Sequence, residues 1–308
     1  MKRIATFTGL LALAALAHAQ NNVSWVASTG IDINTCVRTS PCRTLAVAYA
    51  KTEAAGTIRM VDAADYGPLV ISKAITLDGG TSGGMVGGGS GNAITVTPGY
   101  NDMINLRNFA IHMAGPYTGI VVHSGGLAVI NVENVSITAD DLGGGILVNS
   151  DGRDFSTDTQ VRVRNVSVAG TAIGVVIGNG RFTAEHLAVD TRSDALLLRT
   201  NLFHAVIRDS AFHSTNNGVA VSITTDDQTI FNRNVLIEHS DMSQSTTGVY
   251  VCQNKPAVKV NVRLTDNVIT ANGVGVFQCN GQQLVTFRNN VLEGNSIDGT
   301  LVNGSTFK

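Results

Sequence analysis

Charged side chains suited to proton transfer gather in the second half of the chain. Asp190, Arg192 and Asp194 occupy one turn, and His213 follows at the matching place of the next sequence repeat. An Asp beside a His can hold and move a proton near neutral pH, and a nearby Arg can bind an acidic sugar. We therefore predict Asp190 and His213 as catalytic candidates and Arg192 and Asp194 as substrate-binding candidates. A solvated surface ion pair explains the same residues.

The adjacent pair Asp226 and Asp227 lies in one of the two longest insertions. Two carboxylates that flank a glycosidic bond perform glycoside hydrolysis, so both are catalytic candidates. Adjacent side chains usually diverge, which leaves a polar loop or a weak calcium site as the alternative. Arg199 and Tyr250 complete the substrate-binding candidates. The other long insertion carries Asp151, Arg153, Asp154 and Asp158.

A repeated phrase predicts the elements that position these groups. An apolar residue, a usually charged residue and an Asn, Asp or His recur eight times, at intervals of 21 to 31 residues. The third residue of each phrase, here the anchor, is Asn108, Asn134, Asn165, His186, Asp209, His239, Asp266 or Asn289. Apolar residues two positions before and three positions after every anchor indicate two short strands around a tight bend. Asn and Asp tolerate the left-handed backbone of such a bend.

A third strand usually begins nine residues after the anchor with Gly or Ala and alternating apolar residues, as in residues 174–177 and 248–251. Coils of three strands indicate an all-β parallel solenoid, and the Leu/Asn consensus of a leucine-rich repeat is missing. The order strand, Asn bend, strand, Gly-apolar-x-apolar resembles the pectate-lyase-like superfamily over residues 25–308. The resemblance implies a right-handed parallel β-helix, an exported bacterial protein and a short N-terminal capping helix.

The residues themselves also predict the capping helix. Ser40 can serve as N-cap with Pro41 at the first helical position, and residues 44–55 are rich in Ala, Leu, Lys and Glu before Gly56. We predict a cap segment over residues 20–56 and the β-helix over residues 57–308.

The sheet that carries the substrate in pectate lyases and polygalacturonases lacks their motifs in this chain. Asn-Thr-Asp, Gly-His-Gly, Arg-Ile-Lys and Arg-x-Pro-x-x-Arg are all missing from the sequence. The outward positions of this sheet are predicted as Leu147, Val176, Leu197, Ala220 and Tyr250. An apolar stripe supplies no acid or base, but it could stack on a sugar or join copies of the chain as a homo-oligomer.

Stacking of the coils predicts two structural columns. The residues before the anchors alternate in charge, as in Arg164 and Glu185, and should form an ion-pair ladder. The anchors should form a ladder of hydrogen bonds, with His186 and His239 as bend residues. These two histidines lie two coils apart and are poorly placed to share a metal ion, so we predict no metal site and no cofactor, apart from the alternative of a loop calcium ion.

The four cysteines and the N-terminus predict export. Cys252 and Cys279 lie 27 residues apart, one above the other in neighbouring coils, and Cys36 with Cys42 can close a small loop. Residues 1–19 combine Lys2 and Arg3, a short apolar run and a small-x-small site near Ala19, which is typical of a Sec signal peptide. The chain is therefore predicted to be secreted or periplasmic, without a membrane span.

Composition narrows the function. A net charge of −2 with 14% charged residues argues against nucleic-acid binding. The missing motifs favour a non-catalytic surface, adhesion or carbohydrate-binding module that contacts a polysaccharide or cell-surface glycan. The alternative is a polysaccharide lyase or glycoside hydrolase of an unrecognised subfamily.

Overall fold

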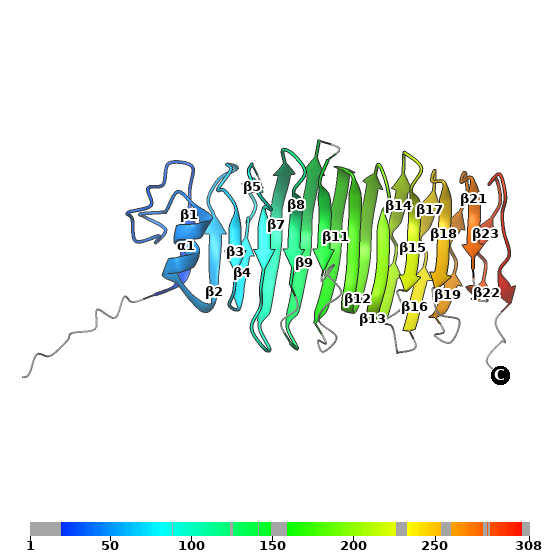
Figure 1. Ribbon diagram of the computed structural model, residues 1–308. Coiled ribbons are helices and arrows are strands. Elements are labelled where there is room, and N and C mark those ends of the chain that lie inside the picture. Colours follow the sequence, from blue (N-terminus) through cyan, green and yellow to red (C-terminus); the bar gives the residue numbers. More distant parts are fainter. Residues whose placement is uncertain are drawn as a thin grey trace, which may run out of the picture.

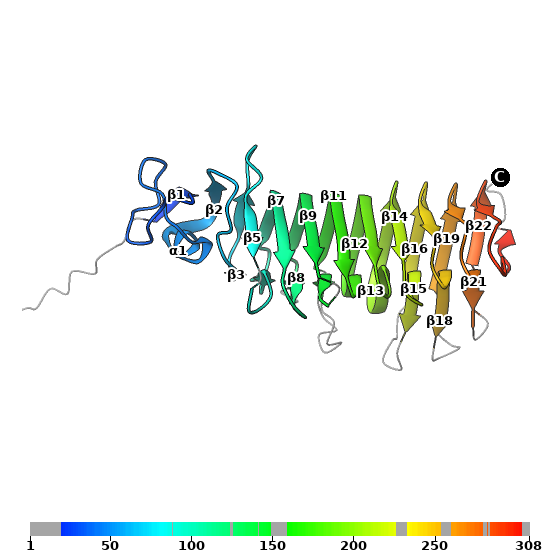
Figure 2. The same ribbon diagram turned by 90° about the horizontal axis from the view of Figure 1, so that it is seen from above.

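The chain is an all-β parallel solenoid, as the sequence predicts. The computed structural model describes residues 20–87, 89–123, 126–140, 142–148, 159–225, 233–253, 260–279, 282 and 284–303. Within these residues the 24 strands join one continuous hydrogen-bonded sheet that winds through stacked coils. Figure 1 shows the coils in succession from the N-terminal end to the C-terminal end, and Figure 2 shows them from above. The one helix of the described residues, α1 (Leu45–Lys51), lies beside the first coil (Figure 1).

The strands form three parallel stacks. The first stack, before the anchors, contains β1 (Asn21–Val26), β2 (Thr52–Met60), β4 (Ile75–Asp78), β7 (Met103–Met113), β9 (Val129–Ala139), β11 (Gln160–Thr171), β12 (Ile173–Thr191), β13 (Leu196–Arg208), β16 (Arg233–Glu238), β19 (Val260–Thr265), β22 (Leu284–Arg288) and β24 (Val302–Asn303). The second stack, after the anchors, contains β5 (Met85–Gly87), the ends of β7, β9, β11 and β12, and then β14 (Ala211–Ser214), β17 (Asp241–Ser243), β20 (Val268–Ile269) and β23 (Val291–Leu292). The third stack contains β3 (Leu69–Ile71), β6 (Ile94–Val96), β8 (Thr118–Val122), β10 (Gly144–Val148), the starts of β12 and β13, β15 (Val219–Thr225), β18 (Thr247–Gln253) and β21 (Val274–Gln278).

Every predicted anchor adopts the left-handed conformation. The φ angles of the eight anchors lie between 46° at Asn289 and 62° at Asn108. One left-handed residue turns the chain sharply, so the first and second strands of a coil meet at an angle without an intervening loop. The bend repeats from coil to coil because the strands on both sides of it pair in register with those of the neighbouring coil.

The core is a set of apolar stacks, because every second residue of a strand points into the coil. One such stack runs through Ile104, Ile130, Val161, Phe182, Ala205, Val235, Val262 and Leu284, all of which are buried. The apolar residue predicted three positions after the anchor is likewise buried in seven of the eight coils and partly buried at Leu292.

Two ladders of polar side chains, which the repeated phrase did not predict, lie inside the later coils. In each ladder a side-chain oxygen accepts a hydrogen bond from a backbone N–H of the preceding coil. The first ladder contains Ser210, Ser240, Asn267 and Asn290, and the second contains Ser245, Asn272 and Asn295. Because these bends bury backbone donors away from water, the side chains that satisfy them are structural.

The cap differs from the prediction. Helix α1 begins after Thr44, whose side chain accepts a hydrogen bond from the Val47 N–H, so Thr44 and not Ser40 is the N-cap. The helix is seven residues long and ends at Lys51, whereas residues 52–60 form β2 and pair with β1. Thr52 pairs with Asn21 of β1, and the Ala55 N–H donates a hydrogen bond to the Ala74 carbonyl directly before β4, so these tertiary contacts outweigh the helix propensity of residues 52–55. The predicted boundary between the cap segment and the β-helix falls at residue 56, inside β2, and stays a prediction.

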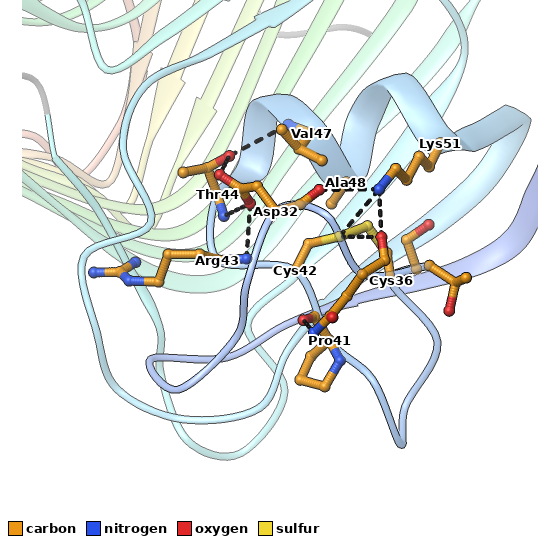
Figure 3. Close-up of a disulfide and its surroundings, with 12 residues drawn as sticks. Asp32, Cys36, Pro41, Cys42, Arg43, Thr44, Val47, Ala48 and Lys51 are labelled. Atoms are coloured by element: carbon orange, nitrogen blue, oxygen red, sulfur yellow. Dashed lines mark hydrogen bonds between the residues drawn. A yellow bond between two sulfur atoms is a disulfide. The ribbon is translucent and has the colours of Figure 1, made fainter.

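Both predicted disulfides form. Cys36 and Cys42 close a loop in the cap, where the Asp32 carboxylate accepts hydrogen bonds from the backbone of Arg43 and Thr44 (Figure 3). Cys252 and Cys279 join neighbouring coils with their α-carbons 4.9 Å apart, which matches the predicted register.

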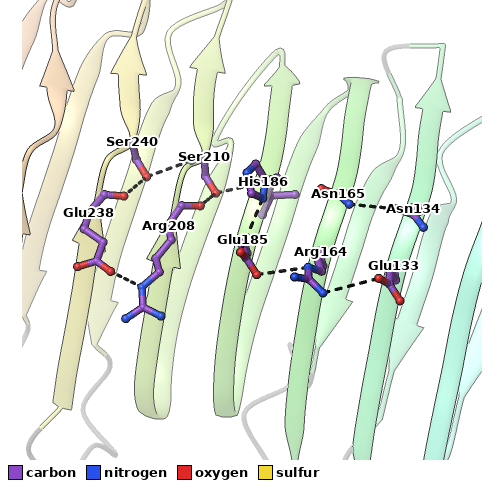
Figure 4. A network of polar contacts seen from close by, with 11 residues as sticks. Glu133, Asn134, Arg164, Asn165, Glu185, His186, Arg208, Ser210, Glu238 and Ser240 are labelled. Atoms are coloured by element: carbon purple, nitrogen blue, oxygen red, sulfur yellow. Dashed lines mark hydrogen bonds and ion pairs between the residues drawn. The ribbon is translucent and has the colours of Figure 1, made fainter.

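The column before the anchors is an ion-pair ladder, as predicted. Arg164 lies between Glu133 and Glu185, at 3.9 and 3.4 Å, and Arg208 pairs with Glu238 (Figure 4). At the start of the ladder, burial raises the pKa of Asp78. Hydrogen bonds from Asn108 and Gly80 and the charge of Arg107 more than offset that rise, so the pKa lies below its usual value. The anchor ladder is present as well: Asn165 donates to Asn134 (Figure 4), and Asn134 donates to Asn108.

Removing Arg164 should have little effect on stability despite its two partners. The Arg164 side chain is 59% exposed, and exposed ion pairs contribute about 0–1 kcal/mol each. We expect Arg164→Met to lower the free energy of unfolding by less than about 1 kcal/mol in urea titrations. A loss above about 2 kcal/mol would contradict this expectation and would mean that the ladder contributes substantially to the stability of the coils.

Within the described residues, no helix has both the length and the apolar character needed to cross a bilayer. The predicted signal peptide falls on residues 1–19, outside the described residues.

Candidate functional site

An open groove follows the bend between the first and second stacks. It has a volume of about 650 Å³ and extends over four successive coils. Its lining residues are His186, Leu187, Ala188, Asp209, Ser210, Ala211, His239, Ser240, Asp241, Asp266 and Val268. We call it the bend groove.

The left-handed bend explains why these residues face one another. His186, Asp209, His239 and Asp266 are consecutive anchors and form one wall of the bend groove. Two positions after each anchor, the strands of the second stack contribute Ala188, Ala211, Asp241 and Val268, which pair in register from coil to coil. We call this second column the floor of the bend groove. Three of its four side chains are small or apolar.

Imidazoles and carboxylates pair across neighbouring coils in and beside the bend groove. His239 Nε2 lies 3.8 Å from Asp266 Oδ2, and His213 Nε2 lies 3.5 Å from Asp241 Oδ1. The side chains of His239 and Asp266 are 60% and 31% exposed, so this pair meets solvent. Such groups can donate and accept hydrogen bonds with a polar ligand.

The structure brings two of the predicted catalytic candidates together. Asp190 and His213 are register partners in β12 and β14, as predicted. They lie two positions beyond the floor residues Ala188 and Ala211, on the same face of the second stack. The side-chain contact of His213 Nε2, however, is with Asp241 of the following coil. Asp190 and His213 therefore border the bend groove, and their catalytic role stays a prediction.

The predicted substrate-binding residues Arg192, Asp194 and Arg199 have different surroundings. Arg192 is exposed in the turn after β12, and Arg199 is partly buried in β13. The Asp194 carboxylate accepts a hydrogen bond of 3.0 Å from the Val219 N–H, so it holds the start of β15 in place. This contact gives Asp194 a structural part whether or not it also contacts a ligand.

The outward positions of the third stack differ from the prediction at Ala220. Leu197 pairs with Ser222, so Ser222 takes the outward position and Ala220 is buried. Ala220 instead occupies the column of Gly174 and Gly248, where space is short: a Cβ at Gly174 would lie 2.3 Å from Val189 Cγ1. The requirement for a small residue in that column shifts the register by two positions and keeps the same face outward.

The predicted apolar stripe is buried, not exposed, in its middle. Val176 and Leu197 are only 4% and 5% exposed, although they point outward from the third stack. At the C-terminal end, the rings of Tyr250 and Phe277 stack face to face with centroids 5.3 Å apart. Stacked rings cover one face of each other, so this pair offers no continuous flat platform for a sugar chain. Whether the stripe joins copies of the chain stays a prediction.

The remaining candidates cannot be placed. Asp226 and Asp227 lie outside the described residues, as do Asp151, Arg153, Asp154 and Asp158. The calcium alternative for that loop therefore stays a prediction. In the described part of the chain, no group of three or more His, Cys, Asp or Glu is arranged to hold a metal ion.

The four anchors of the bend groove were predicted as bend residues and Asp241 was not singled out, although a signal was present. The anchors are Asn in the first three phrases and change to alternating His and Asp from residue 186 to residue 266. Asn, Asp and His all occur in the left-handed conformation, so the bend by itself does not explain the change of residue type. Asp241 is a second signal, because its column otherwise contains Ala, Ser or Val. What the sequence does not show is that the two columns face each other.

Comparisons of this protein with protein-family models, with curated proteins and with solved structures find no match.

Proposed function

We propose that this chain is an exported right-handed β-helix of the pectate-lyase-like type that binds a polysaccharide in the bend groove without cleaving it. The observation that carries the proposal is the course of the bend groove, which follows four successive coils and stays open to solvent. Such a groove suits an extended polymer, because each coil presents similar groups at a step of about 4.8 Å.

The groups in the bend groove suit sugars. Carboxylates of Asp209, Asp241 and Asp266 accept hydrogen bonds from hydroxyls, and the floor at Ala188 and Ala211 can contact the apolar C–H faces of a sugar. None of the described residues that line the bend groove is Phe, Tyr or Trp, so sugar stacking there is limited to the imidazole rings. We therefore expect weak binding, with a Kd of about 0.1–1 mM for a short oligosaccharide.

Solvent access favours binding over catalysis. Acid and base groups gain most of their effect in a site from which water is excluded. In the bend groove the side chains of His186 and His239 are 56% and 60% exposed. Export is supported by the two disulfides, because such bonds persist in oxidising compartments, and by the charged and apolar pattern of residues 1–19.

Filling the bend groove should abolish binding. Ala211 points outward from β14, so Ala211→Trp places a large ring over the floor without entering the core. We expect at least a roughly ten-fold loss of affinity for a bound polysaccharide, because a loss of that size needs only about 1.4 kcal/mol of blocked contacts. Calorimetry and affinity electrophoresis measure the loss.

Ser136→Trp is the matched control. Ser136 occupies the same column of the second stack in an earlier coil and does not line the bend groove. Equal binding by the wild type and Ala211→Trp would contradict the proposal. The same samples are assayed for new reducing ends and unsaturated sugars. Release of either product would favour the lyase or hydrolase alternative.

A further inference from the structure

The three carboxylates of the bend groove alternate between its two sides. Asp209 and Asp266 are anchors in the wall, whereas Asp241 belongs to the floor column of the second stack. The three residues come from three consecutive coils, so each coil contributes one carboxylate. Along the solenoid the carboxylates therefore lie on the wall, the floor and the wall, at steps of about 4.8 Å.

The charge in the bend groove is not compensated by strong bases from the described part of the chain. The lining residues there include no Lys or Arg. The nearby Arg208 directs its guanidinium to Glu238 on the outer ladder (Figure 4). The basic groups that lie against these carboxylates are imidazoles: His213 lies 3.5 Å from Asp241 and His239 lies 3.8 Å from Asp266, and His186 also lines the bend groove. A lining with three carboxylates and no lysine or arginine favours positively charged groups over acidic sugars.

We propose that the bend groove binds a polymer of β-1,4-linked 2-amino sugars, with one protonated amine for each coil. This inference rests on the proposed function and names the class of polysaccharide. In an extended β-1,4-linked chain, neighbouring sugars face opposite ways and advance by nearly the spacing of one coil. Amines at the 2-position then alternate between two sides of the chain, as the carboxylates of Asp209, Asp241 and Asp266 do.

Other cations fit the arrangement less well. An extended peptide advances by about 3.4 Å per residue, so its lysines would meet the carboxylates out of step. A metal ion needs several ligands around one point, and the described residues contain no such group of three. A polyuronate would bring its carboxylates against those of Asp209 and Asp266.

The first test compares four hexasaccharides and one peptide by calorimetry on the purified chain at neutral pH and low salt. The probes are β-1,4-linked glucosamine, its N-acetylated form, cellohexaose, hexagalacturonate and a Lys-rich peptide. We expect the glucosamine oligomer to bind roughly ten-fold more tightly than each of the others, and this preference to fall as salt screens the contacts.

Each other outcome overturns the inference in a distinguishable way. Equal binding of the glucosamine oligomer and cellohexaose would leave the proposed function intact and reject the amine contacts. Equally tight binding of the Lys-rich peptide would show a general attraction for cations without the alternating fit. If no oligosaccharide binds, the proposed function fails together with the inference.

A second test moves one carboxylate without changing their number. In the double variant His239→Asp with Asp241→Ser, all three carboxylates lie on the wall of the bend groove. Asp already occupies the left-handed bend at positions 209 and 266, so the backbone accepts this change. We expect the double variant to lose its preference for the glucosamine oligomer over cellohexaose. An unchanged preference would show that charge alone matters and would reject the alternation.

Single variants support the second test if the double variant folds poorly. Asp241→Asn should weaken binding of the glucosamine oligomer by roughly three-fold and leave cellohexaose unaffected. Asp140→Asn is the matched control, because Asp140 is an exposed carboxylate directly after β9, in an earlier coil, and does not line the bend groove. Equal losses in the two variants would reject a specific contact at Asp241.

Discussion

Replacing Asn272 with Ala is expected to lower the free energy of unfolding by about 3–5 kcal/mol. Asn272 is 3% exposed; its side-chain oxygen accepts a bond from the Ser245 N–H, and its amide donates to the Met242 carbonyl and to Asn295. The substitution leaves the Ser245 N–H and the Met242 carbonyl buried without these partners. Each such group costs about 1–3 kcal/mol, which is why the expected loss is large.

Asn261→Ala is the control for the Asn272 prediction. Asn261 also donates a side-chain hydrogen bond to the preceding coil, to Asn234 at 3.3 Å, but it is exposed on the outer face of β19. We expect Asn261→Ala to lose less than about 0.5 kcal/mol, because water replaces the bond. Similar losses in the two variants would contradict the structural role of the inner ladder.

Urea titrations should follow both variants with two probes. Trp25 is the single tryptophan and lies in β1, so its fluorescence reports unfolding of the first coil. Far-ultraviolet circular dichroism reports the whole sheet. Because coils of a solenoid contact mainly their neighbours, unfolding near Asn272 need not move with unfolding near Trp25. We therefore expect Asn272→Ala to lower the urea midpoint of the dichroism transition and to shift the midpoint of the fluorescence transition less.

Removing the bond between Cys252 and Cys279 is expected to cost about 3.5 kcal/mol. The bond closes a loop of 27 residues, and the chain-entropy relation gives about this value for such a loop. The bond joins two late coils in a region where the described strands are short: β20 and β23 contain two residues each. The measurement is urea unfolding of Cys252→Ser, Cys279→Ser and the double variant.

The three serine variants provide an internal control. Since one bond is lost in every case, the two single variants and the double variant should unfold at nearly the same urea concentration. The bond between Cys36 and Cys42 spans only six residues, so its removal should cost less, about 2 kcal/mol. A larger loss at Cys36 than at Cys252 would contradict the loop-entropy account.

Most of the fold could be predicted from the sequence because the repeat is dense. Each anchor has apolar residues on both sides, and the same pattern returns eight times. A single instance would be weak, but stacking requires all of them to agree, which fixes the bends, the core faces and the disulfide register together. The ion pairs of Arg164 follow from the same register.

The failures of prediction lie where local preference and tertiary pairing disagree. Residues 52–55 favour a helix by composition but join β2, where Thr52 pairs with β1 and the Ala55 N–H donates to the Ala74 carbonyl. Ala220 was predicted to point outward from the alternation of side chains along its strand. That alternation has a period of two residues, so it cannot distinguish registers that differ by two. Asn272 belongs to no part of the repeated phrase, and its role depends on a buried backbone N–H of Ser245 that sequence patterns do not display.

Residue types repeated at matching positions were enough to predict the solenoid, the left-handed anchors, the outer ladders and the two disulfides. Which polar residues share a groove depends on tertiary contacts that no pattern in the sequence displays. Asp209 and Asp241 are far apart in sequence and belong to different columns of the repeat. They face the same space because a left-handed bend turns two strands toward each other and parallel pairing brings successive coils into register.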